Sequence, residues 1–154
     1  MKKILTAAIA ATTFAGAAFA GGHGGTADLA EPTIARQMMM GQVGKAMGHL
    51  AGMAKGETAY DARLADAAFR VMATSAIGFG ALFPEGSESG NETEAAPAIW
   101  SDREGFDAAV AKLLADATAA INAAPADAEA FGAVFGAVAG NCRACHEAYR
   151  ISKN

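Results

Sequence analysis

The 154-residue chain has no excess of positive charge, no long apolar run after its first twenty residues and only two cysteines, and each shortage excludes a class of protein. Its 12 Lys and Arg residues against 16 Asp and Glu residues leave a formal charge of −4, so no positive excess is available for nucleic-acid phosphates. No apolar run of membrane-spanning length follows the first twenty positions, so we expect no stable membrane insertion of the body. Two cysteines cannot form a disulfide framework. The length suits one domain with a buried core.

The N-terminal segment has the pattern of an export signal. A lysine pair is followed by an apolar, alanine-rich stretch over residues 4–14 and by the small-x-small tripeptide at 18–20. This predicts a signal peptide over residues 1–20 that is cleaved after Ala20, and hence export, in a bacterium to the periplasm. The alternatives are an N-terminal helix and a membrane anchor. Residues 21–30 then form a flexible leader, and residues 31–154 form the folded domain.

The body shows helical rather than strand spacing, and alanine is the largest part of its apolar residues. Four segments are predicted as amphipathic helices: about 32–55, about 59–82, a third that begins at a capping box of Ser101 and Glu104, and a fourth that Asp127 caps. The expected inner stripes are Met40, Val43, Met47 and Leu50; Leu64, Ala68, Val71, Ser75 and Phe79; Phe106, Val110, Leu113, Ala117 and Ile121; and Phe131, Phe135, Val138, Cys142, Cys145 and Tyr149. The fold class is therefore all-α, an antiparallel four-helix bundle. The polar, acidic stretch between Phe83 and Pro97 is expected to be a long exposed crossover.

The strongest chemical signal is the run Cys142-Arg143-Ala144-Cys145-His146 near the C-terminal end of the fourth helix. This is C-x-x-C-H, the attachment signature for c-type haem. Residues three apart share one face of a helix, so two thiols there can meet the two vinyl groups of one porphyrin edge. His146, beside the second thiol, then supplies the proximal iron ligand. The sequence thus predicts one covalent haem c on Cys142 and Cys145.

Three other interpretations of the cysteine pair remain. A thioredoxin-type dithiol opens a helix after a strand, whereas this pair lies near the end of a helix and no strand is predicted. A zinc site needs a closed ligand set, for which only His49 or His23 is left, and neither has a partner at ligand spacing. A buried structural pair leaves His146 without a role.

The chain resembles the class II cytochromes c, the cytochrome c′ family, over nearly the whole mature sequence. The matching positions are Arg36-Gln37, Lys55-Gly56-Glu57, Tyr60-Asp61, Phe83-Pro84, Ile99-Trp100-Ser101 and the run from Cys142 to Arg150. The C-terminal motif is highly specific and the others are supportive. The resemblance implies a four-helix bundle with the haem attached near the C-terminus of the last helix.

The resemblance also assigns two residues of the first helix. Arg36 is expected near a haem propionate, and Met40, one turn further on, is expected to face the open side of the iron. The five-coordinate members usually carry an apolar non-ligand there, whereas the low-spin branch, the cytochrome c-556 type, carries a methionine that binds iron. Helix geometry also selects Met40, which shares a face with Arg36 and leads the inward seam through Val43 and Met47. Met39 is the next candidate, and the methionine run also fits adaptable core filler.

The residues therefore predict a one-electron carrier with His146 and Met40 as axial ligands rather than an enzyme. The alternative is a five-coordinate haem that binds NO or CO at the distal face, and a third interpretation is a thiol oxidoreductase. The expected partners are redox proteins with basic patches, and the resemblance adds a homodimer through the first two helices. His49 is expected at the surface, Trp100 either at the haem edge or as a helix anchor, and Arg150 beside the proximal pocket or as a helix C-terminal cation.

Overall fold

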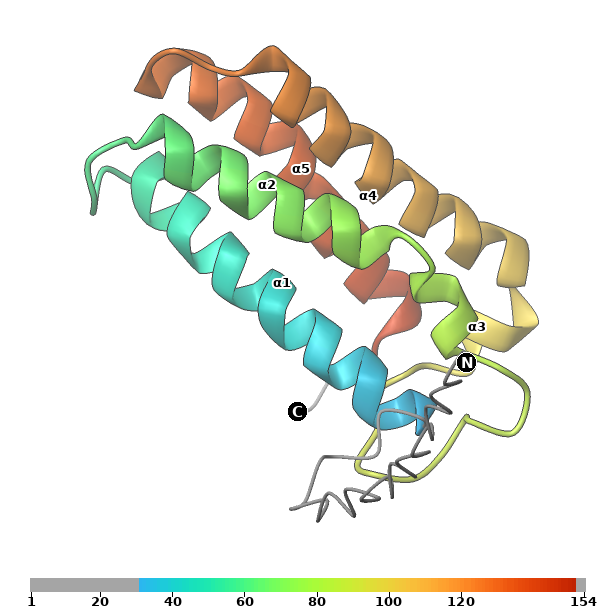
Figure 1. Cartoon of the computed structure of the whole chain (residues 1–154). Helices are drawn as coiled ribbons and strands as arrows, with labels where there is room; N and C mark the ends of the chain where they lie inside the picture. The colour runs from blue at the N-terminus through green and yellow to red at the C-terminus, as the bar shows by residue number, and fades with distance from the viewer. Residues whose placement is uncertain (1–30, 152–154) are drawn as a thin grey trace, which may run out of the picture.

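The structure is a computed structural model that describes residues 31–151, and it is built from four long antiparallel helices (Figure 1). The predicted signal peptide over 1–20 and leader over 21–30 lie outside the described residues. The long helices are α1 (Pro32–Ala54), α2 (Ala62–Ala76), α4 (Arg103–Ala123) and α5 (Ala128–Tyr149), with the short helices η1 (Phe79–Leu82) and α3 (Ala98–Ser101) between α2 and α4. The all-α bundle is confirmed. Within residues 31–151, no helix has the length and apolar character needed to cross a membrane.

Acidic side chains cap the four long helices. The carboxylates of Glu31, Asp61, Asp102 and Asp127 each accept a hydrogen bond from a backbone N–H in the first turn of the helix that follows. Asp127 is the predicted cap, but the predicted cap at Ser101 is wrong. Ser101 is the last residue of α3, and the chain turns into α4 at Asp102, whose carboxylate reaches the N–H of Gly105 at 3.2 Å.

The second helix differs from its prediction in length and in orientation. It ends at Ala76 rather than Leu82, because Gly78 adopts φ +73° and starts the short helix η1. The expected stripe is also wrong in part, because Leu64 and Val71 are 41% and 37% exposed. Phe69 and Met72 are fully buried instead, and these larger side chains remove more apolar surface from water.

One end of the bundle is filled by a core of buried apolar side chains. We call it the closed end; it holds the turns at 55–61 and 124–127 (Figure 1). Its buried side chains come from all four long helices and include Leu50, Phe69, Met72, Ala120 and Phe131. The ring of Phe131 contacts Tyr60, whose O–H donates to the carbonyl of Pro125 at 2.5 Å and joins the two turns.

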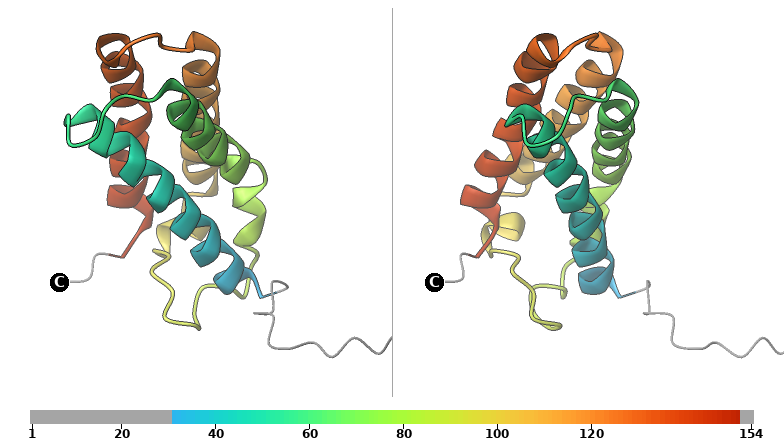
Figure 2. Two further views of the ribbon diagram at one scale, coloured as in Figure 1. Left: turned by 60° about the vertical axis from the view of Figure 1, so that its left-hand side comes forward. Right: turned by 90° about the vertical axis from the view of Figure 1, so that its left-hand side faces the viewer.

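At the other end lies the crossover, which we define as residues 83–97. In both views of Figure 2 the N-terminal end of α1 and the C-terminal end of α5 diverge, and the crossover loops beside them. Most of it is exposed as predicted, but Ser87 is buried, and a single antiparallel bridge pairs Ala95 with Arg150. A second core cluster of Phe79, Phe83, Ile99 and Phe106 underlies it.

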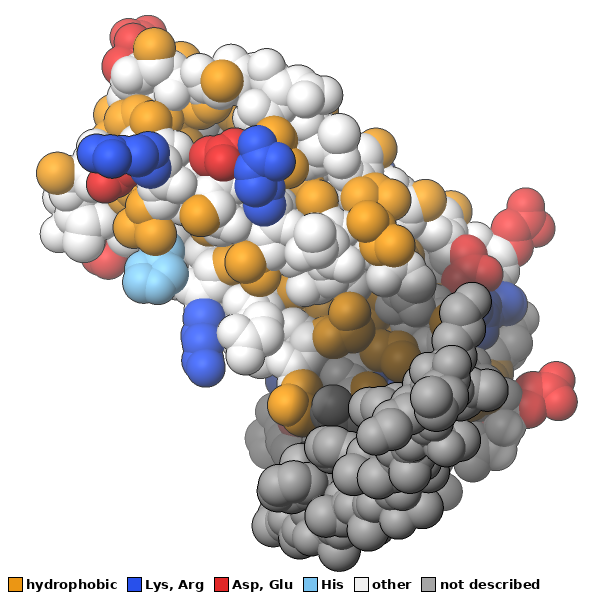
Figure 3. Space-filling model, viewed as in Figure 1, with side chains coloured by type: hydrophobic (Ala, Val, Ile, Leu, Met, Phe, Trp, Pro, Cys, Tyr) orange, Lys and Arg blue, Asp and Glu red, His pale blue; other side chains and the backbone are white. Residues whose placement is uncertain are grey.

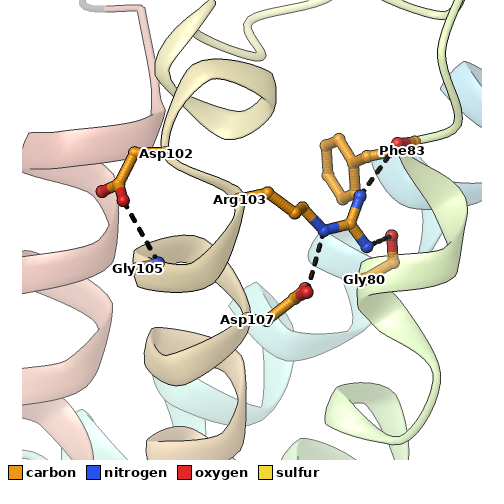
Figure 4. Close-up of polar contacts among 6 residues, drawn as sticks. All are labelled: Gly80, Phe83, Asp102, Arg103, Gly105 and Asp107. Carbon is orange, nitrogen blue, oxygen red and sulfur yellow. Dashed lines mark hydrogen bonds and ion pairs between the residues drawn. The ribbon is translucent and has the colours of Figure 1, made fainter.

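Arg103, at the start of α4, anchors the short helix η1. Its guanidinium donates to the carbonyls of Gly80 and Phe83 at 2.8 and 3.1 Å and to Asp107 at 2.9 Å (Figure 4). These bonds fasten the beginning of the crossover to α4.

The face seen in Figure 3 shows hydrophobic side chains scattered among polar ones over α1 and α2. The large exposed apolar side chains of these helices and the residue after them are Met38, Leu64, Val71 and Ile77.

Candidate haem site

A cavity of about 730 Å³ opens between the diverging parts of α1 and α5. Its walls come from α1, α4, α5 and residues 91–95 of the crossover, and most of the lining side chains are apolar or aromatic. The volume is within the range of sites that take small molecules and cofactors. All five predicted site residues line this cavity: Arg36, Met40, Cys142, Cys145 and His146.

The α5 wall carries both thiols and the imidazole of the motif. Cys142 and Cys145 are half-buried free cysteines on the same side of the helix. Burial raises the pKa of both thiols, because desolvation disfavours the thiolate. Burial also lowers the pKa of His146, the nearby charge of Arg150 lowers it further, and Glu94 opposes the change. Neutral imidazole, the form that binds a metal, is thereby favoured.

The α1 wall of the same cavity carries Met40. Met40, Val43 and Met47 line the cavity, as the predicted seam requires. The neighbouring methionines differ, since Met38 is 49% exposed and Met39 is not part of the described lining. The structure therefore places Met40 rather than Met39 at the cavity wall, while its role as a ligand stays a prediction.

Arg36 also reaches the cavity, but most of its donors are engaged elsewhere. The side chain is 4% exposed. Its Nη1 donates to Ser87 Oγ at 3.2 Å, and its Nη2 donates to the Ser87 carbonyl and to Thr93 Oγ1, both at 2.8 Å. The guanidinium also lies 4.7 Å from the ring centre of Phe83. Its predicted contact with a propionate stays a prediction, and its contacts with the crossover were not predicted.

Two further polar groups border the site, and their hydrogen bonds to α4 have no signal in the sequence. Asn141, buried beside Cys142, donates to Asp116 of α4 at 2.7 Å. Tyr149 lines the cavity and donates to Asp102, the cap of α4, at 2.7 Å. Both bonds hold α5 against α4 next to the motif. They join residues 25 and 47 positions apart, so local spacing cannot reveal them.

The remaining candidates take structural positions. Trp100 contacts Phe83 and donates to the carbonyl of Pro84 at 3.1 Å, and it is absent from the part of the cavity wall that the described residues form. It is therefore an anchor of α3. His49 is exposed as expected. Arg150 lines the cavity and pairs with Glu94, its Nε donating at 2.6 Å.

The other interpretations of the cysteine pair find little support in this geometry. In the described part of the chain, no group of three or more His, Cys, Asp or Glu side chains is arranged to hold a metal ion, so no zinc ligand set surrounds Cys142. A reactive dithiol needs a lowered thiol pKa, whereas burial raises both here.

The site fits a c-type haem. Two thiols and an imidazole stand on one wall, a thioether stands on the other, and the aromatic and aliphatic side chains between them suit a flat apolar macrocycle. One covalently attached haem c matches the two cysteines of the chain.

Comparisons with known proteins agree with this fit. The family model described as "Cytochrome C'" matches residues 31–150. The chain is 42% identical to a cytochrome c-556 of Agrobacterium tumefaciens (strain II Chrys) over 118 residues, which cover 77% of this chain and 95% of the relative. It is 36% identical to the cytochrome c-556 of Agrobacterium fabrum over 153 residues, or 99% of this chain and 97% of the relative. The solved cytochrome c′ from Rhodopseudomonas palustris superposes with a TM-score of 0.78 at 35% identity, covering 80% of this chain and 98% of that one.

Proposed function

The chain belongs to the cytochrome c′ family, whose members are haem electron carriers or gas binders rather than a class of enzymes, and from this premise we propose that it is an exported, periplasmic one-electron carrier. In this carrier Cys142 and Cys145 would hold the haem c covalently, and His146 and Met40 would bind its iron. The single observation that carries this proposal is that Met40 lines the same cavity as the C-x-x-C-H motif.

Each residue has a distinct task in this carrier. Haem c supplies one-electron exchange between ferric and ferrous iron. The imidazole of His146 would bind the iron from the α5 helix, and partial desolvation favours its neutral form by lowering its pKa. The thioether of Met40 would be the second iron ligand, which would leave no open site for a substrate, and its soft sulfur would favour the ferrous state. The aromatic side chains of Phe79, Phe83 and Phe106 line the cavity and limit the access of water.

The alternative is a five-coordinate haem that binds NO or CO on the distal face. Relatives named cytochrome c-556 and cytochrome c′ both match the chain, so the family alone does not choose between the two. Met40 is only half-buried, which leaves room for it to turn aside. The choice therefore rests on whether its sulfur reaches the iron.

The ferric visible spectrum of the purified holoprotein tests the proposal. We expect a low-spin Soret band and a thioether-to-iron charge-transfer band in the red. Met40→Leu should convert this spectrum to a broad high-spin one, because leucine offers no donor. Met39→Leu is the matched control, since Met39 is not part of the described cavity lining, and it should leave the spectrum unchanged. A high-spin wild-type spectrum, or an unaltered one in Met40→Leu, contradicts the ligand assignment.

Attachment and export have their own test in the intact mass. A mature chain that begins at Gly21, carries one added haem mass and has no titratable thiol fits both proposals. A colourless product with two free thiols, made in a host that assembles c-type cytochromes, supports the thiol oxidoreductase instead.

The proposed partners are redox proteins with basic patches. Cleavage after Ala20 removes Lys2 and Lys3 and takes the formal charge from −4 to −6, which favours such encounters, and their rate should fall as salt is added. A homodimer through α1 and α2 is a second proposal. The exposed side chains of Met38, Leu64 and Val71 on these helices support it, and sedimentation analysis of the holoprotein tests it.

A further inference from the structure

Arg36 joins the helix that carries Met40 to the crossover. Its two terminal nitrogens bind the crossover at Ser87 and at Thr93, positions 51 and 57 residues further along the chain. Two of these three acceptors are hydroxyl groups and one is a carbonyl, so the buried charge serves to hold backbone and side chains rather than one carboxylate. The stacking on Phe83 adds a third point of attachment.

The next residues of the crossover are attached to the helix that carries His146. The N–H of Ala96 donates to the Tyr149 carbonyl at 3.0 Å, and the N–H of Ile151 donates to the Glu94 carbonyl at 2.7 Å. The side chain of Arg150 also donates to the Glu94 carboxylate at 2.6 Å. Residues 93–96 therefore bridge from Arg36 on α1 to the end of α5.

This bridge crosses the mouth of the cavity, where residues 91–95 form part of the wall. The two helices that it joins diverge at this end (Figure 2). The spacing of α1 and α5 sets how closely Met40 can approach a metal bound by His146. A polar strap between them limits that spacing in addition to the second core cluster.

The geometry points to Arg36 as a positioning residue: it clamps the crossover as a strap between the distal and proximal helices and so keeps Met40 within reach of the iron. This inference rests on the proposed function. It differs from a contact with a propionate, because the partners of Arg36 here are Ser87, Thr93 and Phe83 of the chain itself.

Arg36→Gln in the holoprotein tests the strap, and Arg103→Gln is the matched control. Arg103 also binds the Phe83 carbonyl, but it fastens the crossover to α4 rather than across the cavity (Figure 4). The first readout is hydrogen exchange at the amides of Ala96 and Ile151, which lie on the far side of the strap. Loss of charged hydrogen bonds at Arg36 should speed their exchange by about tenfold or more. Arg103→Gln should change it less than about twofold.

The second readout is the rate at which ferrous protein binds CO, which requires Met40 to move away. We expect Arg36→Gln to bind CO about tenfold faster than wild type, with Arg103→Gln near the wild-type rate. If Arg36→Gln does not fold, Thr93→Val decides at Ile151, because it removes one acceptor of Arg36 and keeps a similar shape. Ala96 is not used for this variant, since the Thr93 hydroxyl also accepts a hydrogen bond from the neighbouring N–H of Ala95. Thr93→Val should move exchange at Ile151 and the rate of CO binding in the same direction by a smaller factor.

The inference is overturned if the variant at position 36 leaves exchange at Ala96 and Ile151 at the wild-type rate, or if the Thr93 variant that replaces it leaves exchange at Ile151 at that rate. It is also overturned if Arg103→Gln has the same effect on both readouts. Failure of the proposed function looks different: the wild-type spectrum then lacks the thioether band. In that case hydrogen exchange at Ala96 and Ile151 still tests the strap, because that measurement does not depend on whether Met40 binds the iron.

Discussion

The closed end and the cavity end of this bundle use the same four helices but hold them together differently. At the closed end, Leu50, Phe69 and Phe131 are at most 1% exposed and fill the space between the helices. At the cavity end that space is about 730 Å³, and polar contacts across it link the helices instead. Packing thus stabilises both ends, while the cavity end also keeps the room that a cofactor needs.

The largest expected effect compares one buried phenylalanine from each end. Phe131→Ala and Phe106→Ala each remove a ring that is 1% exposed, so each should lower the free energy of unfolding by about 3–5 kcal/mol. Phe106 lines the cavity and Phe131 does not belong to the described lining, so only Phe106→Ala should shift the haem absorption. Denaturant unfolding and the visible spectrum measure the two effects. Equal shifts of the haem absorption in both variants would contradict the assignment of the haem to the cavity end.

The next effect concerns the packing of α4 on α5 beside the motif. A Cβ on Gly105 would collide with the Asp102 carboxylate and the Tyr149 hydroxyl, so Gly105→Ala should cost about 1–3 kcal/mol. Gly136 of α5 has open space around it, and Gly136→Ala should stabilise by up to about 1 kcal/mol. Urea unfolding should therefore show a lower free energy of unfolding for Gly105→Ala and a higher one for Gly136→Ala. A Gly105→Ala variant as stable as wild type would contradict the tight contact at Gly105.

A smaller effect is expected for the hydrogen bond that joins the two turns of the closed end. Tyr60→Phe removes the O–H that donates to the Pro125 carbonyl, and the loss should be about 0.5–1.5 kcal/mol. The ring contact with Phe131 remains. Thermal unfolding should show a lower midpoint and an unchanged haem spectrum. A spectral change would mean that the two ends are coupled.

The smallest effect is a pH dependence at Asp116, where α4 meets α5. The hydrogen bond from Lys112, and then that from Asn141, hold the pKa of Asp116 below its ordinary value of 3.8, although burial opposes this. Its contribution is complete above the unfolded-state pKa and is lost as the pH falls through the lower folded-state pKa. Wild type should therefore lose stability more steeply than Asp116→Asn as the pH falls below 3.8. Parallel acid-unfolding curves for the two proteins would contradict this.

The bundle and the motif were predictable because their signals are local. Apolar spacing gives α1, α4 and α5 their inner faces, and the spacing of Cys142, Cys145 and His146 places them on one wall. The prediction for α2 was right at Ala68, Ser75 and Phe79 and wrong at Leu64 and Val71, which lie at the edge of the buried face. The centre of that face is occupied by Met72 and by small alanine side chains, whose burial a stripe of large residues does not reveal.

The contacts of Arg36 could not be predicted for a different reason. Its acceptors at Ser87 and Thr93 lie in a polar segment that has no periodicity, and nothing in their identity marks them as partners. The buried position of Ser87 follows from the path of the whole chain. Polar contacts between residues so far apart in the sequence depend on how the helices pack, so they can be identified only once that packing is known.

The separation along the chain of the residues that meet at the cavity mouth bears on the order of assembly. Arg36 and Thr93 are 57 positions apart, and Glu94 and Arg150 are 56 apart. Closing loops of that length carries an entropic cost that is recovered only after the helices have docked, so these contacts form late in folding. Until then we expect the sulfur atoms at 142 and 145 to stay accessible, so the chain has an interval in which the haem can be attached before the contacts at Thr93 and Glu94 form.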